Sequence, residues 1–185
     1  MAKNPELNLK SKKSIFKEFI GYFIVTIIAA VFSITLRIFV IEPYIVPTPS
    51  MAPTLLVGDR VIVNKIEYKI KQVKRGDIIA VYSPVEKKNL TKRVIGLENE
   101  EIRLSSDGHI YINGNLLDEP YLPEDTIFSY EDKTYKIGDN QYFLMGDNRN
   151  NSSDSRVFGP VSLDKIFGKV IFIYGPFSRI GNPYK

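Results

Sequence analysis

The sequence predicts a mainly β, antiparallel domain that follows one N-terminal transmembrane helix. Three features support this fold class: Phe19–Leu36 carries no charge, short segments rich in Val and Ile follow it, and Asn113-Gly114 separates two of them. An uncharged run of about 18 residues can span a bilayer. Short β-branched runs broken by turns form strands, and Asn-Gly favours the type I′ turn of a hairpin.

The uncharged run is interpreted as a retained anchor that continues to Ile41, because Arg37 can extend its side chain to the membrane surface. A cleaved signal peptide has a shorter apolar core and a small-residue cleavage site, whereas this run ends in Phe39–Pro43. Five lysines in residues 1–18 predict a cytoplasmic N-terminus. We therefore expect a single-pass cell-membrane protein with a cytoplasmic tail (1–18), an anchor (19–41) and an extracytoplasmic domain (42–185).

Strands are expected wherever Val, Ile and aromatic residues recur between turn residues. These segments are Arg60–Ile66, Asp77–Tyr82, Arg93–Leu97, Glu101–Leu104, His109–Ile112, Asn115–Leu117, Lys133–Ile137, Gln141–Met145 and Lys169–Tyr174. Ser162–Ile166 is predicted to form one helical turn. Glu119–Tyr130 contains two prolines and little periodicity, so a surface loop is expected there.

The composition excludes several classes of function. The chain has no cysteine, which excludes disulfides and thiol catalysis, and its one histidine excludes a multi-histidine metal site. The net charge of +4 arises mainly from the N-terminal tail, so it does not indicate nucleic-acid binding. No metal and no organic cofactor is expected.

The segment Val46–Leu55 places Ser50 among three prolines. Pro49 and Pro53 favour extended backbone at the residue before each of them. A hydroxyl that attacks a carbonyl gains from being held in place before the substrate arrives. Taken alone, the segment is equally compatible with a proline-rich linker between membrane and domain.

A nucleophilic serine requires a base, and the chain offers His109 or a lysine. His109 lies on a strand of the predicted hairpin, where a structural or exposed histidine is favoured. Lys92 directly precedes an apolar segment, and burial there would lower its pKa toward the range of a general base. Its spacing is equally compatible with an exposed lysine at the start of a strand.

Gly146–Arg156 is the densest polar cluster of the sequence, with two aspartates and two arginines. Interlocking ion pairs among them would make this loop rigid. Asn, Asp and Ser side chains could instead simply cap turns. A calcium loop is discounted, because the glutamate that such a loop needs at its twelfth position is missing.

Taken together, these segments resemble type I signal peptidases, membrane-anchored Ser/Lys proteases that remove signal peptides from exported proteins. The resemblance extends to about Tyr174 and rests on four blocks in family order. They are EPY through PTPSMAPTL, RGDIIAVYSP, KRVIGL and GDNRNNSSDSRVFGPV. The single anchor and the short domain are similar to the Gram-positive branch of the family.

The resemblance implies a role for each matching residue. Ser50 would be the nucleophile and Lys92 the general base, while the Thr48 hydroxyl and the Ser50 amide would stabilise the oxyanion. Ser152 would orient the lysine, with Asp154 and Arg156 as a supporting ion pair. The substrate would carry Ala-x-Ala before the cut, in small apolar pockets near Tyr44, Val46, Met51, Leu55, Leu90 and Thr91. Implied partners are signal peptides of secreted preproteins, the lipid bilayer and the export machinery, and not nucleic acid.

The chain departs from the family pattern at two positions. Pro49 replaces the glycine that commonly precedes the nucleophile, and we expect activity because a φ near −65° is compatible with an extended approach. Glu98-Asn99-Glu100 replaces Pro-Gly-Asp after KRVIGL, which affects only a turn.

Two other functions fit these residues less well. A self-cleaving repressor would need a DNA-binding domain in place of the anchor. An inactive anchored β module that binds export or cell-wall partners would tolerate Ser50→Ala.

Overall fold

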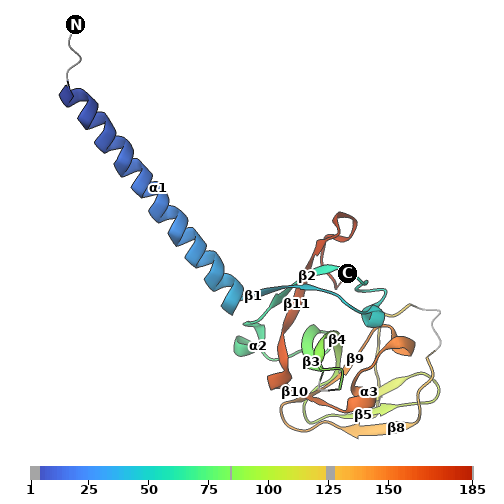
Figure 1. The fold of residues 1–185 in the computed structure, drawn as a ribbon. Helices are drawn as coiled ribbons and strands as arrows, with labels where there is room; N and C mark the ends of the chain where they lie inside the picture. Colours follow the sequence, from blue (N-terminus) through green and yellow to red (C-terminus); the bar gives the residue numbers. More distant parts are fainter. Residues whose placement is uncertain (1–4, 84, 124–127, 185) are drawn as a thin grey trace. The chain divides into compact units, whose positions relative to one another are not determined.

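The computed structural model describes residues 5–83, 85–123 and 128–184, and it confirms a mainly antiparallel β protein with one N-terminal apolar helix. The chain divides into two compact units between Val40 and Ile41. Figure 1 shows the helix α1 in the first unit and the strands in the second.

Helix α1 spans Pro5–Phe39. Within it, Ile15–Phe39 forms a stretch of 25 residues that is long and apolar enough to cross a membrane, the one such stretch in the described part of the chain. It extends beyond the uncharged run at both ends, and Arg37 lies in its last turn.

Seven strands form the larger sheet of the second unit, in the order β1-β2-β11-β3-β4-β9-β10. All its neighbouring strands pair antiparallel. The bounds are Ile41–Ile45 (β1), Arg60–Asn64 (β2), Ile78–Ser83 (β3), Lys88–Gly96 (β4), Gln141–Met145 (β9), Val161–Ser162 (β10) and Ile166–Gly175 (β11).

Four strands form a smaller sheet in the order β7-β6-β5-β8. The bounds are Glu101–Leu104 (β5), Ile110–Ile112 (β6), Asn115–Leu116 (β7) and Lys133–Lys136 (β8). The predicted hairpin is confirmed, since Asn113 and Gly114 connect β6 to β7 with φ of 50° and 84°. A type I′ turn requires positive φ at both central residues.

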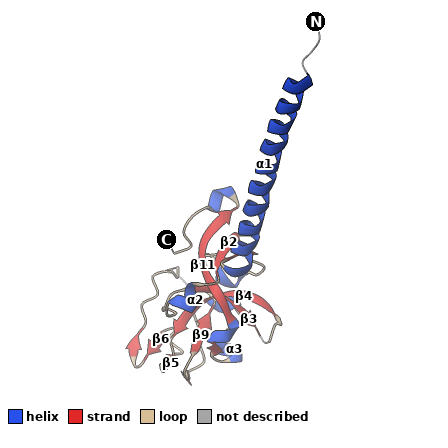
Figure 2. Cartoon of the chain, turned by 90° about the vertical axis from the view of Figure 1, so that its left-hand side faces the viewer, coloured by secondary structure: helices blue, strands red, loops and turns tan. Residues whose placement is uncertain are grey.

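The helical segments of the second unit are short turns that lie between strands or, for the last one, after β11 (Figure 2). They are η1 (Pro49–Met51), α2 (Glu67–Ile70), η2 (Arg149–Asn151), α3 (Ser155–Phe158), η3 (Leu163–Lys165) and η4 (Phe177–Arg179). The turn predicted at Ser162–Ile166 is confirmed as η3. The expected loop has no helix or strand at 119–123 and 128–130, and its remaining residues lie outside the described ranges.

Several strand boundaries differ from the sequence prediction. β2 ends at Asn64, because the Asn64 side chain accepts the Ile66 N–H (3.1 Å) and turns the chain. β4 begins at Lys88 because it pairs with β3 as far as Ser83. β1 was not predicted, since Pro43 interrupts its pattern. Its place at the edge of the sheet tolerates a proline, which cannot donate a backbone hydrogen bond.

The core covers both faces of β4. Val94 packs with Leu144 in one hydrophobic cluster, and Ile95 packs with Phe143 in another. Every residue from Leu90 to Gly96 is therefore buried, including the charged Lys92 and Arg93. The fold thus places two cations inside the protein, where each needs a polar partner.

Candidate functional site

Ser50 lies in η1, a single 3-10 turn whose start is fixed by its sequence. Thr48 precedes the turn in extended conformation (φ −133°, ψ 152°), as expected for a residue before proline. Pro49 occupies the first helical position of the turn. A proline is favoured there because it needs no hydrogen-bond acceptor. The Ser50 side chain is buried, with its Oγ 3.2 Å from Thr48 Oγ1.

The loop that follows β9 holds this turn in place. Asn148 N donates to the carbonyl oxygen of Ser50 (3.0 Å). A Cβ atom at Gly146 would lie 2.3 Å from that same oxygen and 2.3 Å from Ser152 Oγ. Position 146 therefore requires glycine, and its backbone fills the narrow space between Ser50 and Ser152.

Lys92 extends from β4 and is 1% exposed. Its Nζ donates to Ser152 Oγ (2.9 Å). Ser152 in turn lies beside Gly146, which also packs against the carbonyl oxygen of Ser50. Burial lowers the pKa of Lys92 to about 8, against the opposing attraction of the Asp154 carboxylate. At pH 7 roughly a tenth of this lysine is thus uncharged, against less than about a thousandth at its ordinary pKa, which favours a role as general base.

Asp154 and Arg156 support the loop that carries Ser152. Asp154 is fully buried and accepts both Arg156 Nε and Nη2 at 2.8 Å. Asp154 also accepts the Gly146 N–H (3.0 Å), and Arg156 donates to the Ser152 carbonyl oxygen (3.3 Å). The ion pair thereby fixes the backbone at Gly146 and at Ser152, which pack against each other.

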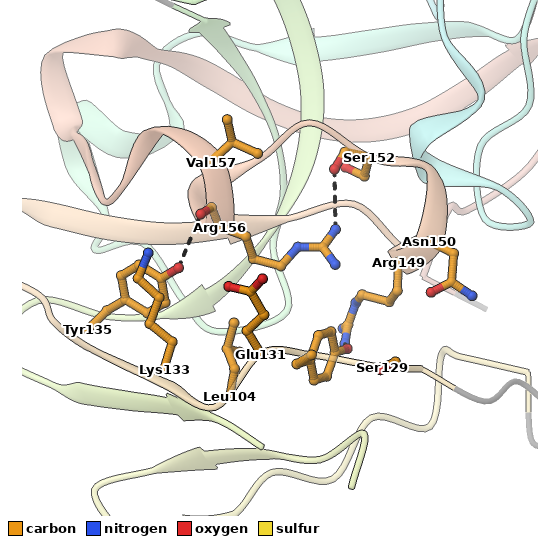
Figure 3. Close-up of a pocket in the computed structure, with 11 residues that line it drawn as sticks. Leu104, Ser129, Glu131, Lys133, Tyr135, Arg149, Asn150, Ser152, Arg156 and Val157 are labelled. Atoms are coloured by element: carbon orange, nitrogen blue, oxygen red, sulfur yellow. Dashed lines mark hydrogen bonds between the residues drawn. The ribbon is translucent and has the colours of Figure 1, made fainter. Parts of the chain in front are cut away.

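A cavity of about 370 Å³ lies beside this ion pair. Figure 3 shows the Arg156 guanidinium pointing toward Ser152, while the Tyr135 hydroxyl donates to the Arg156 carbonyl oxygen (3.1 Å). Arg149 enters the same view from η2. Ser152 lines this cavity and its hydrogen-bond partner Lys92 does not. The cavity therefore lies beside the residues that support Lys92.

Sequence reasoning missed the partners of the other two charges in the polar loop. Asp147 accepts Arg93 Nε (2.8 Å) and Nη2 (2.6 Å), and both side chains are buried. Arg149 pairs with Glu119 and donates to Tyr130 Oη (2.8 Å). The expected ion pairing within the loop therefore holds only for Asp154 and Arg156. The one available signal for Arg93 was its place beside Lys92 in an apolar strand.

The six residues expected around the substrate lie on β1, in or next to η1, and on β4. All except Tyr44 are fully buried, and Tyr44 Oη donates to the Asn89 carbonyl oxygen (2.7 Å). The set is Tyr44, Val46, Met51, Leu55, Leu90 and Thr91. Tyr44 thereby joins the edge strand β1 to the free end of β4, two residues before Thr91.

No group of three or more His, Asp or Glu residues that could hold a metal ion occurs in the part of the chain described by the structure. His109 is exposed and lies 3.3 Å from Asp107. It is therefore not held in a buried site of the kind that contains Lys92.

Three comparisons relate the chain to known proteins. A model of the family described as signal peptidase, peptidase S26, matches residues 18–175. The chain is 39% identical to a probable signal peptidase I-2 of Synechocystis over 83% of this chain and 72% of that protein. It is 36% identical to signal peptidase I T of Bacillus subtilis over 96% and 94%. A crystal structure of a signal peptidase I from Enterococcus faecalis, 34% identical, covers 54% of this chain and 97% of its own, with a TM-score of 0.47.

Proposed function

Because the chain belongs to the signal peptidase family, peptidase S26, we propose that Ser50 is its nucleophile and Lys92 its general base. The protein is a membrane-anchored serine peptidase that removes signal peptides from preproteins, and an inactive binding module is not favoured. One observation carries the proposed roles: buried Lys92 is hydrogen-bonded to Ser152, which contacts the same glycine as Ser50.

The reaction begins when neutral Lys92 takes the proton of the Ser50 hydroxyl. Ser50 Oγ attacks the carbonyl carbon of the scissile bond, and Lys92 then gives the proton to the departing amine. Water completes deacylation, with Lys92 again acting as base. Burial of Lys92 supports this role, since it lowers the pKa of the ammonium to about 8.

The oxyanion is stabilised by the Thr48 hydroxyl and the Ser50 N–H. Two observations support this assignment: Thr48 Oγ1 lies 3.2 Å from Ser50 Oγ, and Ser50 N is in the first turn of η1. The first N–H groups of a helix have no acceptor within the helix. A donor of this kind contributes on the order of 3 kcal/mol to transition-state stabilisation.

Substrate pockets are proposed beside Tyr44, Val46, Met51, Leu55, Leu90 and Thr91. Their side chains are apolar or aromatic, apart from the Thr91 hydroxyl, and they lie around η1 and β4. All of them except Tyr44 are fully buried, so a substrate side chain that packs beside them has to be small, as in an Ala-x-Ala site.

The apolar span in α1 supports a placement of the chain in the membrane. We propose a cytoplasmic tail at 1–18, an anchor at 19–41 and an extracytoplasmic domain at 42–185, supported by the lysines before the span. Only ten residues then separate the end of α1 from Ser50. A site that follows the anchor after so few residues of chain suits substrates that are themselves still in the bilayer, delivered by the export machinery.

Cleavage of a preprotein with an Ala-x-Ala site tests the proposed specificity. The full-length protein in detergent is expected to cut after the second alanine, and Leu in place of that alanine is expected to abolish the cut, because the pockets fit only small side chains. Mass spectrometry locates the new terminus. Ser50→Ala should be inactive, while Ser178→Ala, at an exposed serine, should match wild type. Equal cleavage of the Leu substrate would contradict the small-pocket proposal.

The pKa of Lys92 predicts how activity depends on pH. Because only the uncharged amine acts as base, kcat/KM should rise about tenfold per pH unit below 8 and level off above it. A pH series with the same preprotein measures this curve. A midpoint near 10, the ordinary value of lysine, would contradict the general-base role.

A further inference from the structure

Asn148 contacts the turn of Ser50 through two separate donors. Its backbone N–H bonds to the carbonyl oxygen of Ser50 (3.0 Å), and its side-chain Nδ2 bonds to the carbonyl oxygen of Pro49 (3.2 Å). Asn148 has no part in the mechanism given above. Its second bond nevertheless reaches the peptide group that contains the Ser50 N–H.

The geometry of a trans peptide makes this bond significant. The cis bonds among the described residues are Ala52-Pro53 and Gly175-Pro176, so the bond between Pro49 and Ser50 is trans. In a planar trans peptide the C=O and N–H groups are fixed in opposite directions. A hydrogen bond that holds the Pro49 carbonyl therefore also sets the direction of the Ser50 N–H.

The Pro49 carbonyl oxygen also accepts the Ala52 N–H (3.0 Å). Two donors on one carbonyl polarise the peptide group, and hydrogen bonds in such chains strengthen one another. The Ser50 N–H on the other side of this peptide thereby becomes a stronger donor. The two bonds from Asn148 add to this internal bond of the turn in holding it in place.

We propose that Asn148 is a positioning residue, whose side-chain bond to the Pro49 carbonyl orients and strengthens the Ser50 N–H for the oxyanion. The inference rests on the proposed role of Ser50 as nucleophile and amide donor. Asn148 acts through the backbone of Pro49 and Ser50 and does not itself touch the reacting atoms.

The test uses Asn148→Ala and Asn148→Leu in the full-length protein. Both variants keep the backbone N–H that bonds to Ser50, and leucine also keeps the branched shape of the side chain. We expect kcat to fall about 10- to 50-fold, less than the loss of a direct oxyanion donor. KM should stay within about twofold, since the ground-state carbonyl gains less from the donor. The pH midpoint should stay at wild-type value, and exposed Asn151→Ala should match wild type.

A second readout separates positioning from a structural role. A peptide aldehyde ending in Ala-x-Ala forms a tetrahedral adduct with a serine and places an oxygen where the oxyanion lies. Asn148→Ala should weaken its binding by about the factor lost in kcat, and should leave binding of the matching uncleavable peptide unchanged. Equal weakening of both ligands, or an unchanged kcat, would overturn the inference. Activity in Ser50→Ala would instead overturn the proposed function, whatever the Asn148 variants do.

Discussion

Replacing Lys92 by methionine is expected to abolish cleavage and at the same time to make the protein more stable at pH 7. Without a base the Ser50 hydroxyl keeps its proton, and loss of one member of such a catalytic unit lowers kcat by about 10⁴-fold or more. Methionine has a similar length and no charge. It therefore fills the buried space on β4 without the cost of burying an ammonium group.

The expected gain in stability follows from the pKa shift. Burial lowers the pKa of Lys92 from 10.5 to about 8, so the folded protein holds this proton less tightly than the unfolded chain. Between pH 8 and 10.5 the unfolded chain binds a proton that the folded protein has lost, and wild-type stability rises with pH. Below pH 8 the penalty is fully present. Relief of it should contribute about 2 kcal/mol, after the lost bond to Ser152 is subtracted.

Thermal unfolding followed by circular dichroism, at pH 7 and again near pH 10, measures this difference. The advantage of Lys92→Met should shrink at the higher pH, where wild-type Lys92 is neutral. Lys136→Met provides the matched control, because Lys136 is exposed on β8 and should change neither activity nor stability appreciably. A variant that is inactive but less stable than wild type at both pH values would show that Lys92 is no burden on the fold.

Local patterns of the sequence were sufficient to predict much of the β domain. Asn113-Gly114 determines its turn through its own backbone preferences, and β5 and β9 have the bounds that their Val-, Ile- and aromatic-rich pattern predicts. β1 was missed because only its pairing with β2 makes it a strand, despite Pro43. Elements determined by a few neighbouring residues could thus be predicted, while an element that depends on pairing with a distant strand could not.

The candidate site shows the same division. Ser50 and Lys92 could be chosen from ordered motifs, but the burial of Lys92 arises from β9 and from Ser152, which lies 60 residues away. No spacing rule predicts that Asp147 would pair with Arg93 rather than with an arginine of its own loop. The choice depends on the pairing of β4 with β9, which brings Arg93 opposite Met145.

That pair carries the second large prediction, a loss of stability in Asp147→Ala. The Asp147 side chain is 0% exposed and the Arg93 side chain 4%, so removal of the carboxylate leaves a buried guanidinium without its ionic partner. Its contacts with the Gly76 carbonyl oxygen (2.9 Å) and with the Tyr121 ring (3.9 Å to the centroid) remain, but neither supplies a negative charge. Breaking a buried ion pair in this way costs about 3–5 kcal/mol.

A double variant separates the cost of leaving a buried charge unpaired from the cost of changing the buried side chains. In Arg93→Met/Asp147→Leu no charge is left unpaired, so most of the stability lost in Asp147→Ala should return, because apolar residues can replace a buried ion pair at little cost. Denaturant unfolding of the full-length proteins, followed by circular dichroism, measures both variants. Glu131→Ala, at an exposed acid, should stay within about 0.5 kcal/mol of wild type. If the double variant proved as unstable as Asp147→Ala, the cost would lie in the shape of the site, and the pair would be needed to hold the Asp147–Asn148 backbone against Ser50.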